Sequence, residues 1–215
     1  MEMKLREYQD QDFNELMNIV RETWQYDKFC NSKTANKLAQ VFLSSCLTNY
    51  TFSQVAVLKD KVVGIILAKD IKQHKCPFKN RIKQLLTILS LYLTKEGRKV
   101  SKIFADVSQI NKQLLKNCTT PYSAELSLFV VSSTCRNTGI GKVLFQSVIE
   151  YMNRQKLNNF YLFTDTSCNY GFYEHQGMIR RYEKEHNFIV NNQLTKMNFF
   201  IYDYLCNNTY KKYKS

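Results

Sequence analysis

The residues with the clearest chemical potential are two glycines close behind an arginine, in the pattern Arg136-x-x-Gly139-x-Gly141. An apolar run expected to form a strand, residues 124–131, precedes the pattern, and apolar residues at helical spacing follow it. Glycines let the backbone approach an anion closely, and the start of a helix offers unpaired amide groups and the positive end of the helix dipole. The spacing therefore predicts a binding site for phosphate groups.

Two common nucleotide-binding motifs do not fit this stretch. The GxGxxG fingerprint needs a third glycine, and a P-loop needs Gly-Lys followed by Ser or Thr, whereas here Gly141-Lys142 is followed by Val143. The stretch instead resembles the central motif of the GNAT superfamily of N-acetyltransferases: Gln or Arg, two residues, Gly, one residue, then Gly or Ala, between a strand and a helix. A later segment, Phe172–Met178, is similar to that superfamily's Phe-Tyr-Glu-Lys-x-Gly-Phe.

The resemblance includes the order of the elements and covers about residues 3–206, apart from a helical stretch at 70–118. It implies an α/β (α+β) fold of the GNAT type, with a central mixed, mostly antiparallel, twisted sheet flanked by helices. It also implies one N-acetyltransferase domain over residues 1–206, followed by a basic tail at 207–215. The implied reaction moves an acetyl group from acetyl-coenzyme A to a primary amine of a small molecule or protein, by direct transfer in a ternary complex and without a metal.

The resemblance assigns a cofactor site to the glycine-containing loop and to the strand before it. It implies that the backbone amides from 137 to 142 hold the pyrophosphate, while the end of the strand pairs with the pantetheine arm and polarises the thioester carbonyl. Two basic side chains add charge near the phosphates. The implied cofactor-binding residues are Phe129, Val130, Val131, Arg136, Asn137, Thr138, Gly139, Ile140, Gly141 and Lys142.

Tyr173 corresponds to the superfamily tyrosine that often protonates the departing thiolate, a role suited to a phenol held near the sulfur. The alternative is a core aromatic residue in a chain with 14 tyrosines. The superfamily often places an asparagine seven residues before this tyrosine, where Thr166 stands here. Asn169, four residues before Tyr173, is the candidate to contact the cofactor in its place.

Glu125 lies eleven residues before Arg136, the offset at which the histone-acetylating branch of the superfamily carries its general base. An amine arrives as an ammonium ion and must lose a proton before it attacks the thioester, so a partly buried carboxylate suits this task. The alternative is a solvated or ion-paired glutamate in a strand. The resemblance therefore implies that Glu125 and Tyr173 are the catalytic residues.

Other candidates are weaker. Asp165 could bind the acceptor or fix its loop, and His175 is expected to face solvent. His74 and Cys76 resemble half of a metal site without a second half. Trp24 and Tyr26 are expected to close the first helix against the sheet, with an acceptor pocket as the alternative.

Hydrophobic periodicity predicts the elements that must position these residues. The expected strands are residues 4–8, 54–58, 62–68, 124–131, 160–163, 178–181 and 198–206. The expected helices begin near 13, 32, 77 and 140, with a short turn at 170–175. Within 70–118, a second helix is expected to hold Ile103, Val107, Ile110, Leu114 and Leu115 on its apolar face. Strict alternation in 124–131 places Leu126, Leu128 and Val130 on one face and Glu125, Ser127, Phe129 and Val131 on the other.

The helical stretch at 70–118 interrupts otherwise consecutive strands. It is a candidate insertion that covers a site or meets a partner chain; the alternative is a pair of ordinary helices packed on the sheet. Apolar residues from 82 to 93 form a wide face that would suit contact with a second copy, and a homodimer is therefore one expectation.

The chain carries 31 Lys and Arg against 18 Asp and Glu, a net charge of +13 over 215 residues. This excess favours anionic ligands, but no run of five or more like charges occurs, so a solvated surface is preferred to a nucleic-acid interface. Two rival functions remain: a catalytically silent sensor of coenzyme A derivatives, and a basic protein associated with nucleic acid.

The seven cysteines are odd in number, are evenly spread and form no CxxC pair, which argues against a disulfide framework and a zinc site. The charged start lacks the apolar core of a signal peptide, and no window holds the roughly 18 apolar residues of a membrane span. The expectations are a cytoplasmic location, no membrane partner and no metal.

Overall fold

Seven strands form one sheet in the computed structural model, which describes residues 3–76, 78–190 and 193–206. The strands are β1 (Met3–Arg6), β2 (Phe52–Leu58), β3 (Lys61–Asp70), β4 (Ala124–Val131), β5 (Asn159–Asp165), β6 (Ile179–Val190) and β7 (Gln193–Leu205). Their order is β1-β2-β3-β4-β5-β7-β6, and only the β4–β5 pair is parallel. The predicted mixed, mostly antiparallel sheet is confirmed.

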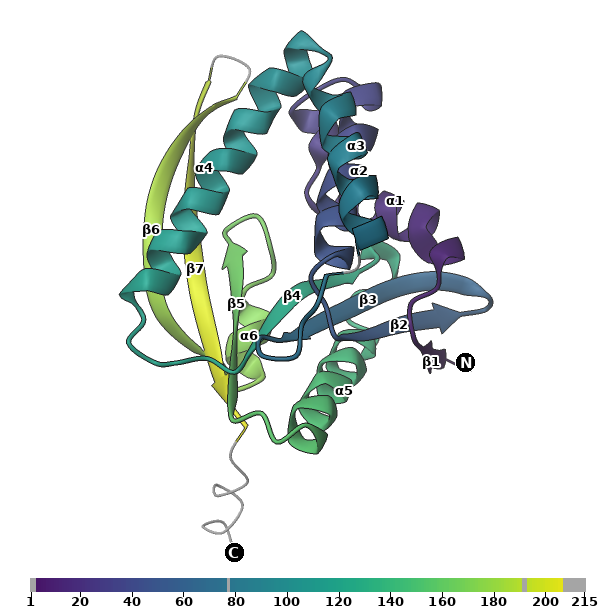
Figure 1. Cartoon of the computed structure of the whole chain (residues 1–215), viewed down its shortest axis with the longest axis vertical. Coiled ribbons are helices and arrows are strands. Elements are labelled where there is room, and N and C mark those ends of the chain that lie inside the picture. The colour runs from purple at the N-terminus through teal and green to yellow at the C-terminus, as the bar shows by residue number, and fades with distance from the viewer. Residues whose placement is uncertain (1–2, 77, 191–192, 207–215) are drawn as a thin grey trace, which may run out of the picture.

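Helices cover both faces of the sheet (Figure 1). They are α1 (Phe13–Thr23), α2 (Ser32–Leu47), α3 (Phe78–Tyr92), α4 (Lys95–Asn117), α5 (Ile140–Arg154) and α6 (Gly171–His175). The first four lie on one side, where α1 and α2 pack on the first half of the sheet and α4 packs on β5, β6 and β7. Helix α5 covers the opposite face through Leu144, Val148 and Met152. The predicted α/β class with flanking helices is confirmed.

The predicted strands at 54–58 and 62–68 are confirmed as β2 and β3, each two or three residues longer than expected, whereas the β6–β7 hairpin was not predicted as a hairpin. The β2–β3 turn holds Lys59 and Asp60 in the left-handed conformation that a tight hairpin requires. The β6–β7 hairpin is longer than the expected strands at 178–181 and 198–206, because pairing continues from Ile179↔Asp203 to its tip. Charged residues such as Glu185 and Lys196, which form an ion pair across this hairpin, hide the apolar pattern there. The predicted basic tail lies outside the described residues.

Strand β4 contains an irregularity that alternation alone does not predict. Leu67 of β3 pairs with Leu128, but the next residue, Ala68, pairs with Leu126. Ser127 is therefore an additional residue in β4, a β-bulge. A bulge locally reverses which side chains point to each face of the sheet.

The bulge overturns one expectation from the sequence. Leu126 packs in the cluster beneath α5, whereas Leu128 and Val130 pack in the cluster beneath α1 and α2. Phe129 contacts the α5 side, as Leu126 does. The prediction that Leu126 shares a face with Leu128 and Val130 is wrong, and Glu125 lies on the opposite face from Phe129.

The helical stretch predicted at 70–118 is confirmed as α3 and α4. Helix α3 packs against α2, and α4 crosses the sheet to pack against β6 and β7 (Figure 1). Ile110 and Leu114 of α4 form a small core with Phe188 and Phe199 of the hairpin. The insertion therefore joins the two halves of the sheet on the side opposite α5.

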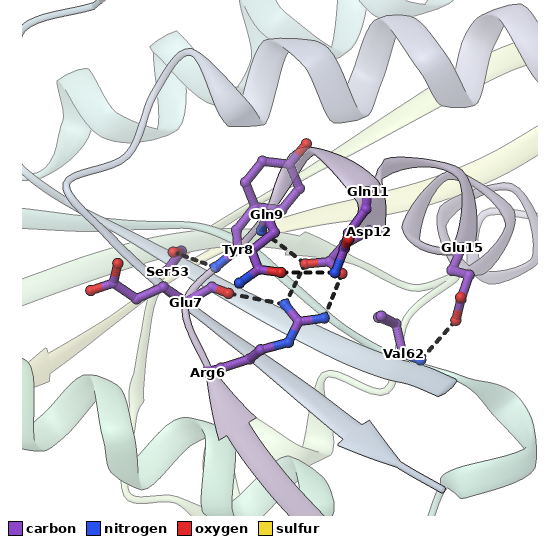
Figure 2. Close-up of polar contacts among 9 residues, drawn as sticks. All are labelled: Arg6, Glu7, Tyr8, Gln9, Gln11, Asp12, Glu15, Ser53 and Val62. Carbon is purple, nitrogen blue, oxygen red and sulfur yellow. Dashed lines mark hydrogen bonds and ion pairs between the residues drawn. The ribbon is translucent and has the colours of Figure 1, made fainter. Parts of the chain in front are cut away.

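A buried carboxylate holds the start of α1 to the first strand (Figure 2). Both terminal nitrogens of Arg6 lie 2.6 Å from the oxygens of Asp12, and the backbone amide of Gln9 donates to Asp12 at 2.9 Å. The side chain of Asp12 is only 2% exposed. One turn later, Glu15 accepts a hydrogen bond from the amide of Val62, which ties α1 to β3.

We expect Asp12→Asn to make the free energy of unfolding smaller by about 1.5–3 kcal/mol at neutral pH. Burial would raise the pKa of Asp12, but the hydrogen bonds from Arg6 and Gln9 outweigh it and lower that pKa. A lowered carboxyl pKa stabilises the fold above the unfolded value of about 4, and this contribution is lost as the pH falls through the folded value. Urea unfolding at neutral and acid pH measures the difference.

The matched control is Asp27→Asn, which removes an exposed ion pair with Arg21 and is expected to change little. If Asp12→Asn leaves both the stability and its pH dependence at the wild-type level, Asp12 does not stabilise the first turn.

Candidate functional site

The sheet splits between its two parallel strands. Strands β4 and β5 pair only at Ala124↔Phe160 and Glu125↔Tyr161, after which they diverge. The edge of β4 that faces β5 therefore carries backbone groups without a strand partner from about residue 126 onward. A ligand with amide groups can form hydrogen bonds with such an edge.

A cavity of about 530 Å³ occupies the split. Its walls come from β4, the 135–142 loop, the end of β5 and α6, with further residues from α1, α2, α4 and β7. Eleven residues predicted for the site line it: Glu125, Phe129, Val130, Val131, Arg136, Asn137, Gly139, Gly141, Lys142, Asn169 and Tyr173. The structure thus brings most of the predicted residues into one cavity.

The loop at the mouth of this cavity has the geometry of an anion cradle. Asn137 and Gly139 both adopt left-handed backbone conformations, with φ of 61° and 88°, just before α5 begins. Successive amides in such a loop converge on one point, and those of residues 140–142 have no carbonyl one turn earlier to accept them. The first helical bond runs from the amide of Val143 to Gly139 at 3.1 Å.

The reason for the two glycines differs from the one inferred from the sequence. A Cβ on Gly139 would meet no atom of the protein within 4 Å, so this residue is required for its positive φ. A Cβ on Gly141 would lie 3.5 Å from the ring of Phe172 and 3.6 Å from that of Phe129, which is ordinary contact. The space in front of Gly139 is therefore open to a ligand.

Positive side chains surround the cradle. Arg136 and Lys142 are exposed at the cavity mouth. Neither makes an ion pair within the part of the chain that the structure describes. Convergent amides, a helix start and two uncompensated cations fit the phosphates of coenzyme A.

The bulge in β4 determines what forms the floor of the cavity. Because Phe129 points to the α5 side, its ring packs against Phe172 at 5.4 Å and against Tyr173 at 6.3 Å between centroids. Val130 is buried on the other face. The backbone of residues 129–131 is thereby exposed along the split edge, beside the cradle.

Tyr173 lies on α6 and lines the cavity beside Phe129 and Phe172. Burial raises the pKa of its phenol well above the usual value, and the nearby Cys168 and Asp165 raise it further. The phenol is therefore fully protonated at neutral pH and can donate a proton. Tyr173 also contacts Tyr202 of β7, at 6.0 Å between ring centroids, which holds α6 against the sheet.

Glu125 lies where β4 and β5 part, and its side chain is 15% exposed. Its carboxylate is 2.5 Å from the ammonium of Lys69, which is also bonded to Asn49 at 3.0 Å. Burial raises the pKa of the neighbouring Tyr161, and its interaction with the Glu125 carboxylate raises that pKa further. Glu125 is thus both ion-paired, as one alternative predicted, and open to the cavity, as a base requires.

Of the other predicted residues, some line the cavity with their side chains and some do not. Asn169 lines the cavity, whereas Thr166 is tied to β7 through hydrogen bonds with the backbone of Asn198. Thr138 and Ile140 do not line it: the Thr138 hydroxyl donates to the Cys135 carbonyl, and the Ile140 side chain is buried in the core. Only their backbone amides remain available to a ligand.

The structure also shows the positions of the weaker candidates. Asp165 lines the cavity and accepts a hydrogen bond from the amide of Ser167, so it fixes its loop. His175 is exposed, as expected. His74 is bonded to the carbonyl of Thr48, and no cluster of three metal-ligating side chains occurs among the described residues. Trp24 both lines the cavity and packs on Phe42, while Tyr26 is buried in the core.

Sequence reasoning missed much of the inner wall. These residues come from elements far apart in the sequence, and no motif marks them: Phe42, Val107, Asn111, Phe163, Thr164, Cys168 and Phe199. Val107 and Asn111 belong to α4, so the insertion covers the site while it packs on the sheet. Helical spacing placed Val107 on an apolar face, but nothing local indicated that this face meets a cavity.

Comparison with known proteins agrees with the family resemblance seen in the sequence. The family model described as "Acetyltransferase (GNAT) family" matches residues 13–178. Arylalkylamine N-acetyltransferase 2 from Aedes aegypti is 17% identical, with a TM-score of 0.60 over 96% of this chain and 100% of that chain. The ribosomal-protein-S18-alanine N-acetyltransferase from Escherichia coli is 8% identical, with a TM-score of 0.55 over 100% of both chains.

An N-acetyltransferase from Staphylococcus aureus Mu50 is 12% identical, with a TM-score of 0.56 over 96% of this chain and 100% of that chain. No curated protein sequence matches the chain. At these identities the solved structures demonstrate a shared fold, and the family model extends over most of the sequence, including the cradle and α6. The chain belongs to the acetyltransferase (GNAT) family.

Proposed function

We propose that this protein transfers an acetyl group from acetyl-coenzyme A to a primary amine, directly and within a ternary complex. The observation that carries the proposal is the split between β4 and β5, which has the anion cradle at its mouth and is lined by both Glu125 and Tyr173. A ligand that fills this split can therefore place phosphates at the cradle while the rest of its length contacts the wall that holds Tyr173 and Glu125.

Each residue has a defined task in the proposed reaction. Acetyl-coenzyme A supplies the thioester when it is bound. An amide at the free edge of β4, near Val130, donates a hydrogen bond to the thioester oxygen and stabilises the negative charge that develops there. Glu125 accepts, through a water molecule, the proton that the ammonium group loses before its nitrogen attacks. Tyr173 donates its proton to the sulfur as the C–N bond forms and the C–S bond breaks.

Direct transfer is favoured over an acyl-cysteine route. Cys168 lines the cavity, but burial raises the pKa of its thiol to about 11, with a further contribution from Asp165. A thiol in this state is a poor nucleophile at neutral pH, because the thiolate is the reactive form.

Calorimetric titration with acetyl-coenzyme A, coenzyme A and ATP tests the proposal, combined with an amine panel followed by release of free thiol. We expect binding of both coenzyme A species, little binding of ATP, and thiol release that depends on an amine. Cofactor binding without transfer to any amine would favour the silent sensor. Absence of cofactor binding, with salt-dependent retention on RNA or DNA, would favour the nucleic-acid alternative.

The inner wall indicates a class of acceptor. Aromatic rings dominate it, from Trp24, Phe42, Phe163 and Phe199. Asn111 also lines it, and its amide oxygen is buried without a hydrogen-bond partner among the described residues. We infer an amine with a flat apolar body and a hydrogen-bond donor at the far end. The name of the similar Aedes aegypti protein, an arylalkylamine N-acetyltransferase, agrees with such an acceptor.

Asn111→Leu is expected to raise the KM for amines that carry a distal hydroxyl by about five-fold, because one hydrogen bond is worth roughly 1 kcal/mol. The KM of the matching amine without a hydroxyl should change little. Gln109→Leu, an exposed position on the same helix, serves as the control. Equal changes in KM for both amines would show that Asn111 does not select the acceptor.

Glu125→Gln tests the proposed base. Glutamine keeps the shape of the side chain but cannot accept the proton. We therefore expect kcat to fall by roughly 10²–10⁴-fold near neutral pH, and to recover as the pH approaches the pKa of the acceptor amine. Glu185→Gln removes the other Lys–Glu ion pair of similar geometry, with Lys196, far from the cavity. An unchanged kcat in Glu125→Gln would assign Glu125 a purely structural role.

A further inference from the structure

The outer face of α3 and the residues beside it hold most of the exposed large hydrophobic residues among those that the structure describes. Seven of the twelve large hydrophobic residues that are exposed lie between residues 71 and 93. Five of them, Ile82, Leu85, Leu86, Leu89 and Leu93, follow one another at helical spacing and are 43% to 80% exposed. They form a continuous stripe along the helix and onto Leu93, the residue that follows its last turn, and this stripe is called the α3 stripe below.

The α3 stripe is the side of the helix that the protein itself leaves uncovered. The opposite side of α3 is attached to α2, where the amide of Gln84 donates to Ser45 at 2.9 Å and Lys37 donates to the carbonyl of Ser90 at 2.8 Å. Leu91, on that inner side, is buried in the core. Helix α3 therefore already packs on the core with its other side, and the α3 stripe is a surface feature.

Positive charge surrounds the α3 stripe. The sequence from 71 to 95 contains six Lys and Arg residues and no Asp or Glu. Three more cations, Arg98, Lys99 and Lys102, are exposed on the first turns of α4. The nearby Glu96 is occupied, since it accepts hydrogen bonds from the amide of Asn31 and the hydroxyl of Thr34.

The exposed cations of this region, Lys72, Lys75, Arg81, Lys95, Arg98, Lys99 and Lys102, make no ion pair with any described residue. A second copy of the chain would bring two such basic surfaces together, each on a protein of net charge +13, and would be repelled. An apolar stripe inside a basic surface is complementary to a layer that is apolar within and anionic at its surface.

We propose that α3 binds to the surface of an anionic lipid bilayer. The leucines and the isoleucine of the α3 stripe enter the boundary between headgroups and acyl chains, and the surrounding lysines and arginines contact lipid phosphates. With 15 residues, α3 is about 22 Å long and lies in the plane of the surface. Within the described residues, no helix is long and apolar enough to cross a membrane. The sequence expectation of no membrane partner rested on spanning segments, which a surface helix does not need.

Flotation of the full-length protein with lipid vesicles tests this proposal. Vesicles of phosphatidylcholine with phosphatidylserine should carry at least about ten-fold more protein than vesicles of phosphatidylcholine alone, and high salt should reduce the bound fraction. The double variant Leu86→Glu/Leu89→Glu should lose this binding, because it places negative charge in the stripe. Leu194→Glu, an equally exposed leucine on β7, should bind as the wild type does.

Circular dichroism and thermal unfolding of each variant confirm that the exposed substitutions leave the fold intact. The proposal is overturned if anionic and neutral vesicles bind alike, if no vesicle binds, or if the double variant binds as well as the wild type. Light scattering provides a further outcome: a stable dimer in solution that the double variant abolishes would make the α3 stripe an interface between two copies instead.

Discussion

Replacing Tyr173 by phenylalanine is expected to lower kcat by about 10²–10⁴-fold while the affinity for acetyl-coenzyme A stays near that of the wild type. The substitution removes one hydroxyl from the wall of the cavity and keeps the ring, which packs against Phe129, Phe172 and Tyr202. The stability of α6 should therefore be preserved. In the proposed reaction, the group that is lost is the proton donor to the departing sulfur.

The pH dependence of the wild type provides a second measurement of the same group. Because burial raises the pKa of Tyr173 above its ordinary value of about 10, the phenol keeps its proton as the pH rises from about 7 to about 10. We therefore expect no loss of kcat from deprotonation of Tyr173 over that range. A fall in kcat with an apparent pKa near 8 that disappears in Tyr173→Phe would contradict this environment.

Tyr170→Phe is the matched control for the loss of a hydroxyl. Tyr170 immediately precedes α6 and packs on Phe200 and Arg180, but it does not line the cavity. Its substitution should leave kcat unchanged. If Tyr173→Phe and Tyr170→Phe retain the same activity as the wild type, another group protonates the sulfur.

Gly139→Ala is expected to weaken binding of coenzyme A more than ten-fold and to destabilise the protein. Gly139 has a φ of 88°, and an L-residue in a left-handed conformation costs about 1–2 kcal/mol. The protein can relieve this strain only by a change in the loop that disperses the converging amides at the start of α5. Calorimetry with coenzyme A measures the affinity, and urea unfolding measures the stability.

Gly177→Ala separates the two effects. Gly177 also has a positive φ, 82°, and a Cβ there would also meet nothing within 4 Å, but the residue does not line the cavity. We expect a similar loss of stability with unchanged affinity for coenzyme A. If Gly139→Ala binds coenzyme A as tightly as Gly177→Ala does, the loop before α5 is not the phosphate site.

Local sequence patterns were sufficient to predict an element and its residues of interest wherever both lie in one short stretch of the chain. The bounds of β4 were predicted as 124–131 and confirmed, because a run of apolar residues ends there at a glycine-containing loop. The cradle could be located for the same reason: its φ angles and its free amides belong to consecutive residues, from Asn137 to Lys142. The residues of Phe172–Met178 likewise placed α6 correctly.

The bulge at Ser127 shows where local patterns fail. Perfect alternation in the sequence predicted one set of faces, but the register with β3 inserts an additional residue and reverses them. The position of the additional residue is determined by the pairing of two strands 60 residues apart, and no property of Ser127 itself predicts it. The consequence is functional, because the reversal places Phe129 against Tyr173 and leaves Glu125 on the other face.

The sequence by itself therefore determined the family resemblance, the order of the elements, the anion cradle and the candidates for proton transfer, since each depends on residues close together in the chain. Only the tertiary structure decided the remainder: the split after Glu125, the ion pair with Lys69, and the closing of the cavity by Trp24 and by Asn111 of the insertion. These features arise from packing between distant segments, whose free energy depends on shape and burial rather than on any local spacing of residue types.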